Sequence, residues 1–187
     1  MKNIILFASG SGSNVEKIIQ HFKSNSEVDI VAVFSNNSNA KVLERAKNHA
    51  IYSEIIPKSD IESDAFAEKI VALQPDLIVL AGFLLKFPAS IIAKYPNKII
   101  NIHPALLPKY GGKGMYGMHV HQAVLENKET ESGITIHYVN EHYDDGAFIF
   151  QEKVSVAACN SAEEIAHKVL ELEHQFFPKV IESLLVR

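Results

Sequence analysis

The chain has 187 residues, 47% of them hydrophobic, which fits one domain with a sizeable core. Its formal net charge is -4 and no long block of Lys or Arg occurs, so binding to nucleic acid or to an anionic membrane through charge alone is disfavoured. Cys159 is the only cysteine, which excludes an intrachain disulfide and a thiolate metal cluster. The first apolar run is too short for a signal peptide or a membrane span, so we expect a cytoplasmic protein with a single domain over residues 1–187.

Apolar runs of strand length alternate with helical patterns along most of the chain. Residues 4–8 predict a buried strand, followed by a helix whose apolar face holds Val15, Ile18, Ile19 and Phe22. The same patterns predict, in chain order, a strand over 28–34, a helix around 42–46, a short strand over 51–56, a helix around 66–73, and strands over 77–81 and 98–102. The run 77–81 is continuously apolar, which is typical of a central parallel strand covered on both faces.

The pattern changes after Gly133. Residues 134–139 and 148–156 predict two strands joined by a loop, and a capping box of Ser161 and Glu164 begins a last helix. That helix is expected to reach about Leu185, with a kink or break at Pro178. The alternation predicts an α/β fold with a single open, mostly parallel twisted sheet, Rossmann-like, and helices on both faces. Ligands of such sheets bind beyond the carboxyl ends of the strands.

A glycine-serine loop follows the first predicted strand and comprises Gly10, Ser11, Gly12, Ser13 and Asn14. Free backbone amides at the start of the next helix favour an anion there. Val15 stands where a dinucleotide fingerprint has its third glycine, and no Lys-Ser/Thr pair marks a triphosphate loop. An ordinary turn that caps a helix would look much the same, but the position after the first strand favours a site for a phosphate monoester.

Asn101, His103 and Asp144 are the candidate catalytic residues. An amide, an imidazole and a carboxylate together can stabilise an oxyanion and move a proton, as acyl transfer to an amine requires. Asn101 and His103 stand two positions apart in an extended segment, so their side chains point to the same side. Each residue alone has a structural explanation, since Asp-Asp-Gly is a common turn and a histidine often serves only as a hydrogen-bonding group. The combination favours the catalytic interpretation.

The chain also contains nine histidines, which invite a metal hypothesis. No His-x-x-x-His pair lies with a carboxylate on a clear helix face, so we expect no metal. We interpret histidines such as His119, His121, His137 and His142 as lining a polar pocket or as solvated side chains. The glycine-rich stretch 111–117 is predicted as a mobile loop beside the site, either closing over a substrate or serving only as a connection.

The sequence resembles the phosphoribosylglycinamide formyltransferases, the folate-dependent transformylases of purine synthesis. The resemblance runs in order along nearly the whole chain, and its most specific part is Asn101-Ile102-His103-Pro104-Ala105-Leu106-Leu107-Pro108. The other matching segments are 9–14, 80–83, 133–139, Asp144-Asp145-Gly146 and Glu173-His174.

The resemblance implies transfer of a formyl group from 10-formyltetrahydrofolate, as co-substrate, to the amine of glycinamide ribonucleotide. It implies that Asn101 and His103, with His103 protonated, stabilise the oxyanion, and that Asp144 holds the imidazolium and helps to remove the amine proton. Residues 10–14 would hold the phosphate, and Glu173 would lie near the ribose or the glycinamide. The folate pocket would be walled by Leu84, Leu85, Lys86, Phe87 and the loop that begins at Asn140. The partners expected are these small molecules alone, with no nucleic acid or membrane, in a monomer or homodimer.

Two features depart from the family pattern. Leu85 stands where the family often has an arginine that contacts the folate tail, and Lys86 next to it is a point charge without the guanidinium fork. The loop after Tyr110 is longer than in common members.

Three alternative functions differ from this one in the residues or domains that they require. A formyltetrahydrofolate hydrolase would use the same three residues, and a non-catalytic phosphometabolite-binding protein would keep only the glycine loop. A methionyl-tRNA formyltransferase would need a further C-terminal domain and a basic face.

Overall fold

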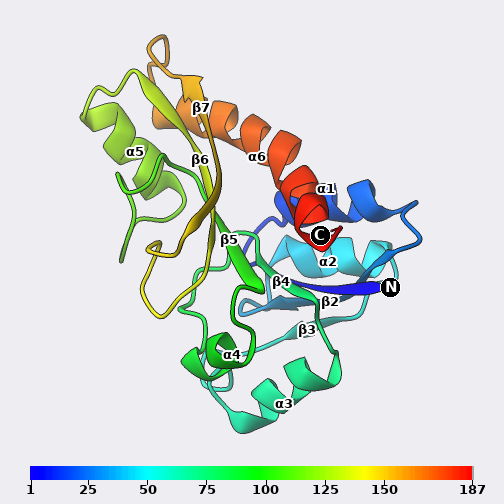
Figure 1. Ribbon diagram of the computed structural model, residues 1–187. Coiled ribbons are helices and arrows are strands. Elements are labelled where there is room, and N and C mark those ends of the chain that lie inside the picture. Colours follow the sequence, from blue (N-terminus) through cyan, green and yellow to red (C-terminus); the bar gives the residue numbers. More distant parts are fainter. Residues whose placement is uncertain (187) are drawn as a thin grey trace.

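The computed structural model describes residues 1–186 (Figure 1). Within them, seven strands form one sheet: β1 (Lys2–Phe7), β2 (Val28–Ser35), β3 (Ser53–Ile55), β4 (Leu77–Leu80), β5 (Ile99–His103), β6 (Glu131–Tyr138) and β7 (Phe148–Ser155). The helices of the same range are α1 (Ser13–Phe22), α2 (Lys41–Asn48), α3 (Asp64–Ala72), α4 (Ala89–Lys94), α5 (Met118–Glu126) and α6 (Ala162–Leu185). No helix of this described range is both long and apolar enough to cross a membrane.

The sheet is open and mostly parallel, as the sequence predicts. Its strand order is β3-β2-β1-β4-β5-β6-β7, and the strands from β3 to β5 pair in parallel while β6 and β7 pair antiparallel. The chain leaves β1 through α1 to reach β2 on one side and later returns through α3 to reach β4 on the other. This reversal opens a crevice at the carboxyl ends of β1 and β4, the usual ligand position in such sheets.

Strand alternation divides the core into two layers. In β1, Ile4 and Leu6 pack on one face of the sheet with α1, α2 and α6, whereas Ile5 and Phe7 pack on the other with α3 and α4. Figure 1 shows the same division, with α3 and α4 on the face opposite α1, α2 and α6. All four side chains are fully buried, so β1 is apolar on both faces. The predicted placement of helices on both faces is confirmed.

The last helix differs from the prediction at Pro178. A kink or a break is expected there, and α6 runs from Ala162 to Leu185 without a break. Pro178 lies on the buried face, next to the fully buried Phe177 and close to the fully buried Ile181. A proline inside a helix costs about 3 kcal/mol. We infer that the apolar contacts of this face offset that cost, so the break predicted from the sequence is wrong.

Two helices were not predicted from the sequence, and one strand begins earlier than expected. α4 has only six residues, too few for a clear periodic pattern. The buried face of α5 includes His121, which interrupts its apolar stripe. β6 begins at Glu131 instead of residue 134, because its polar first residues pair with the outer strand β7. The remaining boundaries shift by one or two residues.

Candidate active site

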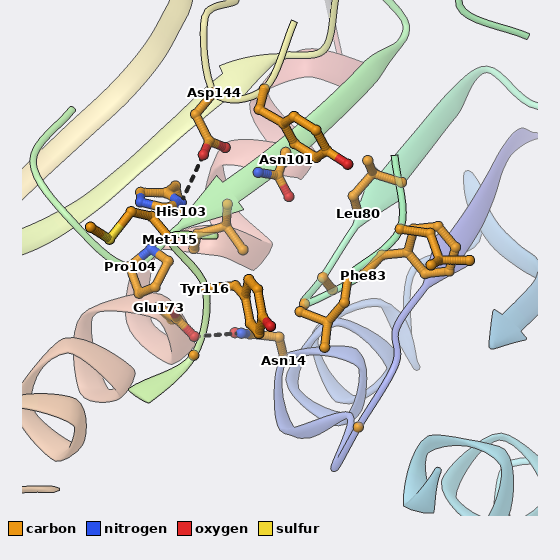
Figure 2. Close-up of a pocket in the computed structure, with 18 of the residues that line it drawn as sticks. Asn14, Leu80, Phe83, Asn101, His103, Pro104, Met115, Tyr116, Asp144 and Glu173 are labelled. Carbon is orange, nitrogen blue, oxygen red and sulfur yellow. Dashed lines mark hydrogen bonds and ion pairs between the residues drawn. The ribbon is translucent and has the colours of Figure 1, made fainter. Parts of the chain in front are cut away.

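One cavity of about 810 Å³ lies at the carboxyl ends of the parallel strands. Its wall includes the glycine loop, the segment after β4, the end of β5, the stretch 112–118, the loop after β6 and the middle of α6. Figure 2 shows side chains from these separate elements facing one another. Every site residue expected from the sequence lines this cavity. The structure thus brings them together, while their individual roles stay predictions.

The glycine loop presents backbone at the start of α1. Gly12 has a φ of 67°, a left-handed conformation that favours glycine, and a Cβ there would lie 2.5 Å from Val42 Cγ2. No side chain of the described residues caps this helix end, so its first amides are free for a ligand. Arg45 Nε donates to the carbonyl oxygen of Ser11 at 2.8 Å and fixes the loop from outside. This geometry suits a phosphate.

A buried polar pair lies beside the loop. Asn14 Nδ2 donates to Glu173 Oε2 at 2.6 Å, and burial raises the pKa of Glu173 to about 7 against the opposing effect of this hydrogen bond. Asn14 Oδ1 is buried and has no hydrogen-bond partner among the described residues. An unpartnered acceptor on a cavity wall is costly, which marks this corner as a place for a donor from a ligand.

The candidate catalytic residues meet at the other end of the cavity. Asn101 and His103 lie on β5, and Asp144 lies in the loop after β6 with a φ of 54°. His103 Nδ1 is 3.5 Å from Asp144 Oδ2, which also accepts a hydrogen bond from the Gly112 backbone amide at 2.9 Å. The side chains of His103 and Asp144 are only 5% and 12% exposed, so their charges interact in a partly desolvated setting.

The protonation of His103 is set by opposing effects. Its Nε2 lies 2.7 Å from the carbonyl oxygen of Tyr110, and because a carbonyl only accepts, Nε2 carries the proton. Burial lowers the pKa of His103, although the charge of Asp144 and the Tyr110 carbonyl act to raise it. Burial also acts to raise the pKa of Asp144, but contact with His137 and the other nearby groups outweighs burial and leaves that pKa low. Asp144 is therefore a carboxylate beside an imidazole that burial biases toward its neutral form.

The structure adds two histidines to the cavity wall, His137 and His121, which the sequence analysis did not select as site residues. His137 Nδ1 donates to the carbonyl of Tyr138 at 2.8 Å, which leaves Nε2 to accept a hydrogen bond from Asn101 Nδ2 at 3.2 Å. The same Nε2 is 3.5 Å from Asp144 Oδ1. His137 thus contacts two of the three candidate catalytic residues. The pairing of β5 with β6 places it directly opposite Asn101, a contact that no local pattern reveals.

His121 is the second of these added histidines. It lies on the buried face of α5, and burial, together with the charge of His103, lowers its pKa to about 4. His121 Nδ1 has no hydrogen-bond partner among the described residues. No group of three or more His, Cys, Asp or Glu side chains in the described part of the chain is placed to hold a metal ion.

The segment 84–87 and Asn140 form another part of the wall. Leu84 is 51% exposed and Lys86 is exposed, whereas Phe87 is buried. The backbone amide of Leu84 donates to Ser9 Oγ at 2.9 Å, which ties this segment to the start of the glycine loop. The wall is mainly apolar, with one cation at Lys86.

Known proteins resemble the chain over nearly its whole length. A family model described as formyl transferase matches residues 2–181. The phosphoribosylglycinamide formyltransferase of Escherichia coli is 37% identical over 96% of this chain and 85% of that protein. The chloroplastic phosphoribosylglycinamide formyltransferase of Vigna unguiculata is 38% identical over 98% of this chain, which spans only 61% of that relative's length.

A solved structure supports the same relationship. The crystal structure of phosphoribosylglycinamide formyltransferase from Anaplasma phagocytophilum superposes with a TM-score of 0.89 at 30% identity, covering 98% of this chain and 87% of that one. The resemblance found in the sequence is thereby confirmed, and so is the fold. The chain belongs to the formyl transferase family.

Proposed function

We propose that this chain transfers a formyl group from 10-formyltetrahydrofolate to the amine of glycinamide ribonucleotide in purine synthesis. The observation that carries the proposal is the convergence of Asn101, His103 and Asp144 at one end of a cavity whose other end is the glycine loop. A phosphorylated amine held by the loop would extend toward these three residues. The names of the relatives give the same transferred group and the same acceptor.

The cavity suits two ligands of this kind. Its volume of about 810 Å³ lies in the upper part of the usual range for ligand sites, roughly 300–1,000 Å³. The free amides at the start of α1 suit the phosphate, and the carboxyl of Glu173 on the cavity wall supports a contact with the sugar or the glycinamide. The apolar wall at Leu84, Leu85 and Phe87 suits a flat heteroaromatic ring, and Asn140 also lines the cavity. Lys86 supplies a cation for a carboxylate tail.

The chemistry assigned to these residues is acyl transfer. The amine nitrogen bonds to the formyl carbon, and the carbonyl oxygen becomes an oxyanion that accepts a hydrogen bond from Asn101 Nδ2. His137 accepts one N–H of that amide, which leaves the other for the oxyanion. The bond from the formyl carbon to the folate nitrogen then breaks, that nitrogen takes up a proton, and the amine proton passes to Asp144 directly or through water.

His103 responds to the charge that develops in this reaction. Negative charge on the oxyanion adds to that of Asp144, and both favour a proton on the imidazole. Burial opposes that proton in the structure, so His103 is protonated most readily when the oxyanion forms. This places the cation where the transition state needs it.

The test measures turnover of 10-formyl-5,8-dideazafolate by absorbance, with and without glycinamide ribonucleotide. We expect turnover only when the ribonucleotide is present, with formylglycinamide ribonucleotide as the product. Turnover without the ribonucleotide would replace this proposal with the hydrolase. Ribonucleotide binding without any turnover would replace it with the phosphometabolite-binding protein.

Other expectations from the sequence accompany this proposal. A location in the cytoplasm, a state of monomer or homodimer and the absence of nucleic-acid and membrane partners all stay predictions. The assignment of residues 1–187 to one domain and the absence of a metal from the reaction stay predictions as well.

A further inference from the structure

We propose that Tyr116, on the glycine-rich stretch after Tyr110, is a binding residue for the ribonucleotide and covers its sugar. This inference rests on the proposed function and assigns a role to a loop that the sequence analysis left open. Tyr116 lines the cavity and the residue is 48% exposed. A large aromatic ring open to a cavity offers apolar area to a ligand.

The position of Tyr116 matches the middle of the expected substrate. In the view of Figure 2, Tyr116 projects toward Asn14 and Glu173, below Asn101 and His103. All of these residues line one cavity, and Tyr116 lies close to Asn14 on the side that faces His103 and Asn101 in this view. A ribonucleotide that joins the phosphate end and the catalytic end carries its sugar between them. The ring of Tyr116 on one side and the Asn14–Glu173 pair on the other would then enclose the sugar.

The local structure holds Tyr116 in place. Its carbonyl accepts a hydrogen bond from the His119 amide at 3.3 Å at the start of α5. Its ring packs edge-on against the His119 ring, with 5.3 Å between centroids and an interplanar angle of 85°. A ring held in this way loses little conformational entropy when a ligand arrives. The side chain is therefore preorganised for contact with a ligand.

The same stretch is joined to the catalytic end. The Gly112 amide donates to Asp144 Oδ2 at 2.9 Å, and the Met115 amide donates to the Gly112 carbonyl at 3.1 Å. Gly112 has a φ of 93°, which favours glycine, and a Cβ there would meet nothing within 4 Å. Glycine is thus favoured at position 112 by the positive φ of the backbone and not by close packing. This stretch carries Tyr116 over the substrate while its Gly112 amide supports Asp144.

The test compares Tyr116→Ala and Tyr116→Phe by calorimetric titration with glycinamide ribonucleotide and, separately, with 10-formyl-5,8-dideazafolate. We expect Tyr116→Ala to weaken ribonucleotide binding about tenfold, the loss of roughly one large contact. Tyr116→Phe keeps the ring and should stay within about twofold of the parent, and both variants should bind the folate analogue within about twofold. Tyr52→Ala is the matched control, because Tyr52 is also about half exposed but lies outside the cavity.

Unchanged ribonucleotide binding by Tyr116→Ala would overturn the inference. Equal weakening of the binding of both ligands would also overturn it, since that result indicates a structural role for Tyr116. A lower unfolding temperature of Tyr116→Ala than of the parent would accompany such a structural role. If the parent protein binds no ribonucleotide, the proposed function fails and the inference falls with it. If the parent and Tyr116→Ala bind the ribonucleotide equally well, the proposed function is unaffected and only the role of Tyr116 is disproved.

Discussion

The glycine-loop end of the cavity and its catalytic end are built in different ways. At residues 10–14 the ligand would meet backbone amides, whose positions follow from the path of the chain and the start of α1. At the catalytic end it would meet side chains of Asn101, His103 and Asp144, which come from two separate segments and touch one another or a shared neighbour. One end depends on where the chain goes, and the other depends on which side chains meet.

This difference indicates how each end would fail. A change of side chain in the loop disturbs binding only where it alters the backbone, as at Gly12, which is pressed against Val42. A change at the catalytic end removes a chemical group and also frees its neighbours, because the Gly112 amide donates to Asp144 and His137 contacts both Asp144 and Asn101. Binding and turnover are therefore expected to separate between the two ends.

The largest effect is expected for His103→Ala. The variant loses the group that would become positively charged beside the oxyanion, and the loss of such a group lowers kcat by about 10²–10⁴-fold. Affinity for glycinamide ribonucleotide, measured by calorimetry, should change little because the loop is intact. His167→Ala is the control, since that side chain is 73% exposed and lies outside the cavity. An equal loss of affinity and turnover would show that His103 supports the whole cavity and would remove the contrast between the ends.

A smaller effect is expected for Gly12→Ala, measured as the free energy of unfolding in urea. The new Cβ would lie 2.9 Å from the Val42 Cα, and the alanine would have to adopt the left-handed φ of 67° that Gly12 has. Strain and overpacking of this kind together cost about 3 kcal/mol. The shift of the loop should also weaken ribonucleotide binding.

The matched control is Gly10→Ala, where a Cβ meets nothing within 4 Å. Its unfolding free energy should stay within about 0.5 kcal/mol of the parent. If Gly12→Ala were as stable as Gly10→Ala, the loop would be able to move away from α2, and its geometry would not be fixed by packing.

The sequence was sufficient for features that are local or strongly periodic. The apolar run at 77–81 predicted a central strand, and Ser161 with Glu164 predicted the start of the last helix, where the Glu164 amide donates to Ser161 Oγ at 3.2 Å. Residues 10–14 were recognisable because a turn after the first strand has its own composition. The open, mostly parallel sheet followed from the alternation of these elements.

Features that depend on contacts between distant segments could not be predicted in the same way. His137 matters because β6 pairs with β5 antiparallel and sets it opposite Asn101, a register that only the folded sheet defines. Pro178 was expected to kink or break α6, but the helix is continuous through it, and periodicity alone does not measure the apolar packing of that face. The stretch 111–117 read as a loose loop, although the Gly112 amide is bonded to Asp144.

The smallest effect is expected for Glu173→Gln, and it concerns the one side-chain pair that supports the loop end. Burial raises the pKa of Glu173 to about 7 in the folded chain, above its ordinary value of 4.5. Between these values the folded state holds a proton that the unfolded state has lost, so the stability of the parent decreases as the pH rises from 4.5 through 7. Glutamine does not titrate and should keep the packing, including a hydrogen bond to Asn14.

The variant should therefore be more stable than the parent at pH 8.5, by on the order of 2 kcal/mol, and the advantage should shrink toward pH 5. Urea unfolding at the two pH values measures this difference. Glu171→Gln, on the same helix with a side chain 68% exposed, should show no such dependence. Parallel pH profiles for parent and Glu173→Gln would mean that Glu173 is solvated. The glycine-loop end would then bind its ligand through backbone amides alone, without help from the pair of Asn14 and Glu173. The two ends of the cavity would differ more strongly than the hydrogen bond between Asn14 and Glu173 indicates.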